Sequence, residues 1–235
     1  MNRREFLAVT SGTGIGLMTS GCWTPPSRRQ SQSPGNRLHL LPYPQQIEKS
    51  GENLPVGGTV SFETLSESAT TRMAVASLKS FLLPVDKKIP VRLGTMEDGY
   101  NSSWLTPEEN QFLAASATSP EASIVKITRR GITVVGKGKA GMLYGVQTVN
   151  QLILQAARER RKSIPCLTIR DWPDMRWRCL SPTLTWYSGW NRLEGYDLCN
   201  WSEGEWKWLA DWSLLHKCNA WAVCMYGYWP FTLPG

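Results

Sequence analysis

Residues 139–153 read KAGMLYGVQTVNQLI, a stretch that has the apolar spacing of a helix and carries two glycines. Its apolar residues recur three and four positions apart, which is typical of an amphipathic α-helix. Gly141 and Gly145 share one face of that helix, because residues four apart lie above one another. Each glycine costs about 1 kcal/mol relative to alanine in a helix interior. We therefore expect a helix over residues 140–157 whose glycine face packs closely against a sheet.

That sheet is expected from β-rich segments on both sides of the helix. Residues 123–128 and 132–135 flank Arg129-Arg130-Gly131, and two such segments around a short turn predict a hairpin. Further segments predict strands at 38–41, 59–64, 90–93 and 166–169 and a helix at 66–83, whereas residues 94–120 show no clear pattern. This order of elements predicts an α+β fold with a small antiparallel sheet and helices on one face.

A different pattern follows residue 172. Residues 176–180 and 220–225 favour short strands, and residues 203–217 favour a helix with one apolar side. Strand, helix and strand joined by short loops form one βαβ unit. A closed (β/α)8 barrel needs about 250 residues. We therefore expect the first βαβ unit of an incomplete barrel here.

Composition and spacing exclude several classes of partner. The formal net charge is +7, yet the only dense basic run is Arg158, Arg160, Arg161 and Lys162 at a predicted helix end, where cations are favourable. Apart from this run, the sequence shows neither a stripe of clustered Lys and Arg residues nor a nucleic-acid-binding motif, so we expect no nucleic-acid partner. The six cysteines lack metal-type spacing and the two histidines lack neighbouring ligands, so we expect no metal and no cofactor.

The first residues are typical of an export signal. Arg3 and Arg4 precede Phe and Leu and resemble the twin-arginine motif. Small residues immediately before Cys22 resemble a bacterial lipobox, in which the cysteine is lipidated; ordinary cleavage nearby is the alternative. We expect residues 1–22 to direct export and residues 23–36, rich in Pro, Ser and Gln, to be a linker. The protein is then periplasmic or on the cell surface, held to a membrane by a lipid on Cys22.

A longer stretch resembles the β-N-acetylhexosaminidases of glycoside hydrolase family 20. SIVKITRRGITVVGKGKAGMLYGVQTVNQLI, followed by IPCLTIRDWPDMRWR, is similar to a strand, a glycine-bearing helix with G-x-Q-T-x-x-Q-L, and IP-x-x-x-I-x-D-x-P in that family. The resemblance implies an accessory domain over residues 37–171. It also implies that residues 172–235 begin the catalytic barrel, with Asp171-Trp172-Pro173 at the junction.

The same resemblance bears on catalysis. In family 20 the acetamido oxygen of the substrate is the nucleophile, and an adjacent Asp-Glu pair on the fourth barrel strand assists it. This chain has no Asp-Glu dipeptide, so we expect the catalytic pair to lie outside it. Glu108-Glu109 favours a solvated loop. Glu194, Asp197, Glu203 and Glu205 surround a predicted helix start, where acidic groups are favourable.

Four residues are candidates for substrate binding. Arg178 matches the first-strand arginine that holds sugar hydroxyls in family 20, and a guanidinium suits paired oxygens; a structural ion pair is the alternative. Most of the twelve tryptophans follow residue 171, and indole faces stack on sugars. Trp186, Trp190 and Trp229, in predicted loops after strands, are candidates for such stacking, with packing as the alternative. Trp206 and Trp212 are expected to pack within the fold.

Two functions therefore remain open. In the first, the chain is the N-terminal portion of an exported glycoside hydrolase that acts on N-acetylhexosamine-containing or related glycans. The substrate class is broad because residues 206–219 are also similar to α-N-acetylglucosaminidases. In the second, the chain is a non-catalytic carbohydrate-binding or cell-surface protein that reuses the accessory domain.

Overall fold

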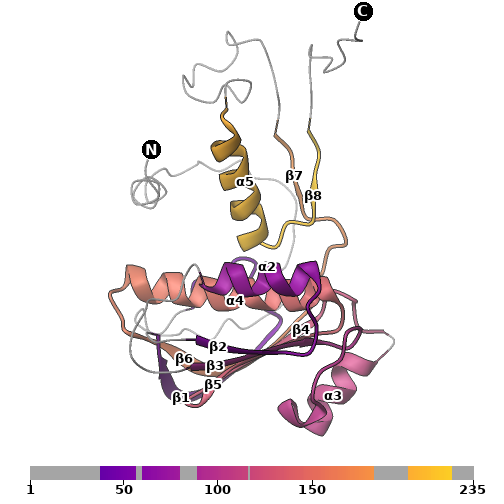
Figure 1. Ribbon diagram of the computed structural model, residues 1–235, viewed down its shortest axis with the longest axis vertical. Coiled ribbons are helices and arrows are strands. Elements are labelled where there is room, and N and C mark those ends of the chain that lie inside the picture. Colours follow the sequence, from indigo (N-terminus) through magenta and orange to yellow (C-terminus); the bar gives the residue numbers. More distant parts are fainter. Residues whose placement is uncertain (1–37, 57–59, 80–88, 116, 183–200, 224–235) are drawn as a thin grey trace, which may run out of the picture. The chain divides into compact units, whose positions relative to one another are not determined.

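Six strands form one sheet in the order β1-β6-β4-β5-β3-β2 (Figure 1). The computed structural model describes residues 38–56, 60–79, 89–115, 117–182 and 201–223, all within one unit that runs from Leu38 to Gly235. The strands are β1 (Gln46–Pro55), β2 (Val60–Thr64), β3 (Ile89–Thr95), β4 (Ser123–Thr128), β5 (Gly131–Gly136) and β6 (Ser163–Asp171). The predicted α+β fold is confirmed, and β4 and β5 form the predicted hairpin.

The sheet is mixed rather than purely antiparallel. β3 pairs in parallel with β2 and β5, whereas β4 is antiparallel to β5 and β6, and β6 is antiparallel to β1. Helix α2 (Ala69–Lys79) connects β2 to β3. A crossover through a helix joins parallel strands, and this connection explains why that half of the sheet differs from the hairpin half.

Helices α2 and α4 (Lys139–Arg158) lie along one face of the sheet (Figure 1). The opposite face is covered at one end by the 3-10 turn η2 (Ser102–Trp104) and by α3 (Pro107–Ala114). Alternation along the strands separates the two faces, since successive side chains point to opposite sides. Val125 and Val134 belong to the core under α4, and Ile124 and Val135 belong to the smaller core under α3.

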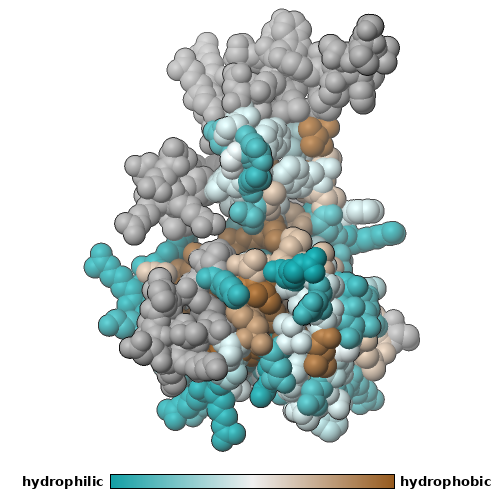
Figure 2. Space-filling view, in the orientation of Figure 1, coloured by the Kyte–Doolittle hydropathy of each residue, from teal (hydrophilic) through white to brown (hydrophobic). Residues whose placement is uncertain are grey.

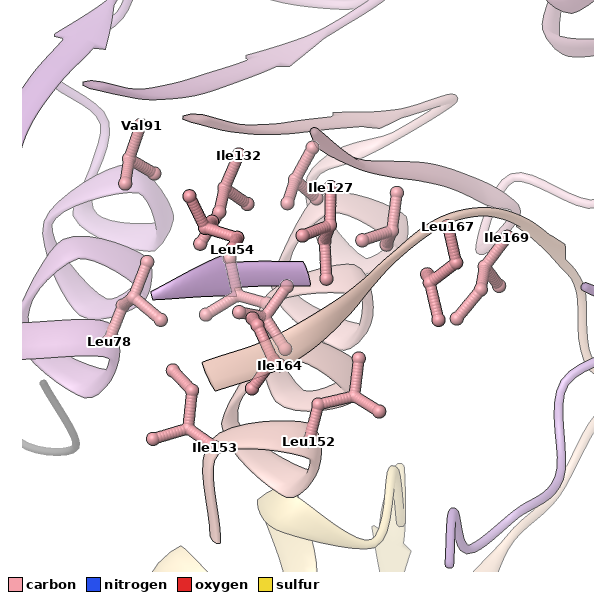
Figure 3. Packing of buried hydrophobic residues seen from close by; sticks show 14 of the residues in the cluster. Leu54, Leu78, Val91, Ile127, Ile132, Leu152, Ile153, Ile164, Leu167 and Ile169 are labelled. Atoms are coloured by element: carbon pink, nitrogen blue, oxygen red, sulfur yellow. The ribbon is translucent and has the colours of Figure 1, made fainter. Parts of the chain in front are cut away.

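The main core lies between α4 and the sheet. Figure 3 shows Leu152 and Ile153 of α4 gathered with Leu54 and Ile164 of the sheet. Leu54, Leu152 and Ile164 are each at most 2% exposed. Burying such a side chain contributes about 1.5–3 kcal/mol relative to leaving it exposed, so the buried residues of α4 contribute strongly to the stability of the core.

The two glycines of α4 are close-packed, as the sequence predicts. A Cβ at Gly145 would lie 2.6 Å from Cγ1 of Val134 and 3.3 Å from Cγ2 of Val125. A Cβ at Gly141 would lie 2.2 Å from the carbonyl oxygen of Ala122, at the start of the hairpin. Both positions are therefore kept as glycine by the distance between helix and sheet.

The segment 38–41 is not a strand, contrary to the prediction. Leu38 and Leu40 are buried in the main core, but the backbone N–H groups of His39 and Leu41 donate to side-chain oxygens of α4, on Gln155 and Gln151. Amide side chains thus replace a strand ladder.

Strand β1 was not predicted from the sequence. It lies at an edge of the sheet, and nearly all of its residues are exposed. An edge strand of this kind lacks the apolar alternation by which strands are recognised.

The acidic pair Glu108-Glu109 lies in the first turn of α3, not in a solvated loop. The hydroxyl of Thr106 accepts from the backbone of Glu109, whose carboxylate accepts from the backbone of Thr106, which is a capping box. Glu109 is 3% exposed, and its Oε2 is 2.7 Å from Nζ of Lys126. The prediction was wrong because T-x-x-E at residues 106–109 is the sequence pattern of a capping box, which begins a helix.

After the sheet domain, a short βαβ unit is present. β7 (Cys179–Leu180) pairs in parallel with β8 (Ala220–Trp221), and α5 (Glu203–Leu215) lies between them in sequence. Glu203 and Glu205 occupy the first turn of α5, as predicted. Among the described residues, no helix has the length and apolar character to cross a bilayer.

We predict that alanine at either close-packed glycine destabilises the protein. Overpacking costs about 1–3 kcal/mol, which outweighs the gain of about 1 kcal/mol in helix propensity. Gly141→Ala should cost more than Gly145→Ala, because a backbone carbonyl yields less than a valine methyl. The measurement is denaturant unfolding of the full chain. Gly204→Ala is the matched control: Gly204 is an exposed helical glycine whose added Cβ would meet only Oγ of Ser202, at an ordinary contact distance of 3.8 Å, so this change should not lower stability. Equal effects at the three positions would contradict the packing.

Candidate functional site

The βαβ unit meets the sheet domain through a group of polar side chains that we call the junction cluster: Glu121, Asp171, Arg178, Lys217 and Asn219. Glu121 precedes β4 and Asp171 ends β6, so both acidic residues come from the sheet domain. Arg178 precedes β7, and the other two residues lie in the turn between α5 and β8. Opposite charges thus come from the two sides of the junction.

Each nitrogen of the Arg178 guanidinium donates a hydrogen bond to a protein atom. Its Nη2 donates to Oε2 of Glu121 at 2.6 Å, its Nε to the carbonyl of Lys217 at 2.8 Å, and its Nη1 to the carbonyl of Met175 at 2.9 Å. Its Cζ also lies 5.2 Å from the ring centroid of Tyr144, within cation–π range. These are the contacts of the structural ion pair that the sequence allowed; sugar binding by Arg178 stays a prediction.

Lys217 forms the second ion pair of the cluster. It is 5% exposed, and its Nζ donates to Oδ2 of Asp171 at 2.7 Å. Burial lowers the pKa of Lys217, and the neighbouring Asp171 carboxylate opposes that shift. The backbone φ of Lys217 is 59°, a left-handed conformation in which glycine is the usual residue. A lysine here strains the backbone where glycine would not, and in return it supplies the cation of the ion pair with Asp171.

Asn219 connects the Arg178–Glu121 ion pair to the backbone that leads into β7. Its Oδ1 accepts from the backbone of Arg178 at 2.9 Å, and its Nδ2 donates to Oε1 of Glu121 at 3.2 Å. Helix α4 contributes one further contact, because Nε2 of Gln151 donates to the carbonyl of Leu215 at 2.6 Å. Carbonyl groups at a helix end need partners from outside the helix, and here the sheet domain supplies one for α5.

A cavity of about 100 Å³ lies beside the junction cluster, lined also by Tyr144 and Trp172. Ligand pockets typically have volumes of 300–1,000 Å³. A more open hollow of about 450 Å³ lies against α2, where Glu67, Arg72 and Lys79 line it. Arg178, the predicted substrate-binding residue that the structure describes, does not line that hollow. Within the described part of the chain, no three His, Cys, Asp or Glu residues are grouped as metal ligands.

The structure describes only some of the residues predicted from the sequence to be functional. Arg3, Arg4, Cys22, Trp186, Trp190 and Trp229 lie outside the described residues, so their roles stay predictions. Trp206 packs against Trp201 and Trp221, with centroids 5.5 and 6.2 Å apart. Trp212 stacks on His216 at 4.2 Å. Both contacts are the packing roles that were expected.

Sequence reasoning missed the pairing in the junction cluster. It placed Asp171 at the junction but gave no partner to it, and it did not single out Glu121, Lys217 or Asn219. Within the cluster, the side chains of these residues bond partners that are 41 to 98 positions away, so no local spacing connects them. A weak signal exists in Lys217-Cys218-Asn219, a polar turn directly before an apolar strand.

Comparisons with known proteins give one consistent result. The model of "Glycosyl hydrolase family 20, domain 2" matches residues 37–172. "Beta-hexosaminidase subunit A2" of Dictyostelium discoideum is 22% identical over 147 residues, which are 61% of this chain and 26% of that protein.

Solved structures agree in fold. CpGH84B superposes with a TM-score of 0.55 at 15% identity, over 79% of this chain and 29% of that chain. The N-acetyl-β-hexosaminidase of Streptomyces plicatus superposes with a TM-score of 0.52 at 19% identity, over 78% and 34%. The chain thus spans about a quarter to a third of the length of these proteins.

We predict that Asp171→Asn destabilises the protein by about 3 kcal/mol, because removing one partner of a buried pair leaves an uncompensated charge. Asp171→Asn combined with Lys217→Met should recover part of the loss. Glu203→Gln is the matched control, since the Glu203–Lys207 pair is largely exposed and such pairs contribute little. Denaturant unfolding of the full chain measures all three. If Asp171→Asn and Glu203→Gln lowered the free energy of unfolding by the same small amount, the proposed strength of the Asp171–Lys217 pair would be contradicted.

Proposed function

The chain belongs to glycosyl hydrolase family 20 through that family's domain 2, and we propose that it is the N-terminal portion of an exported glycoside hydrolase. The substrates are N-acetylhexosamine-containing or related glycans. The observation that carries the proposal is the match over residues 37–172, together with a sheet domain in which the glycine helix packs as that family's motif implies.

The βαβ unit supports the assignment of a barrel to the rest of the protein. β7 and β8 are parallel and adjacent, with α5 between them, which is the repeating unit of a (β/α)8 barrel. The junction cluster fixes this unit to the sheet domain by two ion pairs. In this proposal the domain supports the first barrel strands, and the catalytic Asp-Glu pair lies in residues beyond those of this sequence.

One observation favours the non-catalytic alternative. Three of the five N–H donors of Arg178 are bonded to protein groups, so the side chain already has a structural role and only two N–H donors are left for sugar hydroxyls. A carbohydrate-binding or cell-surface protein that reuses the domain needs no sugar contact at Arg178. The two functions differ in whether an extended protein hydrolyses a glycoside.

We predict that residues 1–235 alone release no chromophore from aryl N-acetylhexosaminides, because no Asp-Glu pair is present. The decisive experiment compares hydrolysis by residues 1–235 with hydrolysis by a longer protein, which also contains the residues encoded by the DNA after the Gly235 codon. The enzyme proposal requires about 190 or more further residues, since residues 172–235 already begin a barrel of about 250, an Asp-Glu pair among them, and hydrolysis that is lost when this pair is changed to Asn-Gln. An extended protein without hydrolysis would support the binding alternative, and hydrolysis by residues 1–235 would refute the placement of the catalytic pair.

The second part of the proposal is location. We propose export through the twin arginines and attachment to a membrane by a lipid on Cys22, as the sequence around these residues suggests. Changing Arg3 and Arg4 to lysine should leave precursor inside the cell, and Cys22→Ala should abolish incorporation of labelled palmitate. Cell fractionation and fluorography measure the two effects. Labelling that persists in Cys22→Ala would show that the anchor is elsewhere.

A further inference from the structure

One end of the sheet domain carries a group of exposed basic residues that we call the basic end: Arg129, Arg130, Arg158, Arg160, Arg161 and Lys162. The strand connections bring these residues together. The backbone N–H of Val56, after β1, donates to the carbonyl of Lys162 at 2.9 Å. Arg129 reaches Glu52 of β1 at 3.5 Å, and β4 and β1 both pair with β6. The turns β4–β5 and α4–β6 therefore lie at the same end.

The basic end carries an excess of positive charge. Two acidic residues lie among the six basic ones: Glu52 pairs with Arg129, and Glu159 pairs with Arg161 at 2.7 Å. The side chains of the other four form no ion pair with any described residue. Figure 2 shows hydrophilic side chains projecting at the left of the view, where Figure 1 shows α4 ending and β6 beginning.

Arg160 occupies a position that glycine would fill without steric cost. Its φ is 54°, and the N–H groups of Arg160 and Arg161 bond the carbonyls of Ala157 and Ala156, which closes the helix. Helices commonly end with glycine in this left-handed conformation. An arginine here adds positive charge to the basic end, but its side chain makes the left-handed backbone conformation less favourable than it is for glycine.

The N-terminal region joins the domain at this same end. The backbone N–H of His39 donates to Oε1 of Gln155, in the last turn of α4, at 3.0 Å. Residues 23–38 separate His39 from Cys22, and a chain of that length spans at most about 60 Å when fully extended. A lipid on Cys22 therefore limits how far the basic end can lie from the membrane.

We propose that the basic end is a membrane-facing surface that binds anionic phospholipid headgroups. The proposal rests on the lipid anchor suggested above, because a lipid on Cys22 keeps the basic end within reach of the membrane, where a polybasic patch adds electrostatic attraction to anionic lipids. Each Lys or Arg near an anionic surface strengthens binding about fivefold. This attraction acts within a Debye length of about 10 Å at 0.1 M salt, a range that the tether allows the basic end to reach.

The test uses the full chain with Cys22→Ala, so that no lipid contributes, and co-sedimentation with vesicles of equal parts phosphatidylglycerol and phosphatidylcholine. Arg160→Gly should weaken binding about fivefold without lowering stability, since glycine suits the backbone there. Arg158→Gln with Lys162→Gln should weaken binding about 25-fold. The matched control is Arg176→Gln with Lys207→Gln, two exposed cations of the βαβ segment, which removes the same charge and should leave binding unchanged.

Several results would overturn the proposal. These are absence of binding to the anionic vesicles, equal binding to pure phosphatidylcholine vesicles, or equal losses for the basic-end and control variants. Binding to duplex DNA as strong as to the vesicles would indicate a general polyanion surface instead of a lipid surface. Palmitate labelling of Cys22 tests the anchor separately. The vesicle experiment uses unlipidated protein, so the two ideas can fail independently.

Discussion

The close approach of α4 to the sheet is the contact on which the rest of the structure depends. Gly141 and Gly145 allow the helix to lie where a Cβ would meet a carbonyl of Ala122 and a methyl of Val134. At that distance the apolar face of α4 closes the main core. The same helix then binds the entering chain through Gln155 and Gln151 and the end of α5 through Gln151. The position of α4 thus determines where both neighbouring segments attach.

The junction cluster depends on this arrangement in turn. Asp171 is at the end of β6 and Glu121 is at the start of the hairpin, so the sheet presents two carboxylates at one end. Arg178 and Lys217 meet them from the βαβ unit. Burial makes each pair costly to break, which ties the two parts of the chain more firmly than exposed pairs would. This is the physical basis on which we assign the domain a supporting role.

Sequence alone predicted the elements whose signals are local. The glycine helix, the hairpin and α5 follow from periodicity, turn residues and capping groups. Strand β1 did not, because an exposed edge strand has no apolar pattern, and the segment 38–41 was assigned as a strand although Gln side chains satisfy its backbone. The capping box at Thr106 and Glu109 was present in the sequence and was overlooked. The contacts of Arg178 could not be predicted, since Glu121 lies 57 positions away.

The most direct test of the account is a double-mutant cycle between Gly145 and Val134. The predicted overlap of Cβ at residue 145 is with Cγ1 of Val134, 2.6 Å away. In a Val134→Ala background that methyl is gone, so Gly145→Ala should become neutral or stabilising, although it destabilises the unmodified protein. Such coupling between residues in contact is typically 0.5–3 kcal/mol. Denaturant unfolding of the four proteins measures it. An equal cost of Gly145→Ala in both backgrounds would show that the helix does not lie against Val134 and would contradict the packing from which the fold is explained.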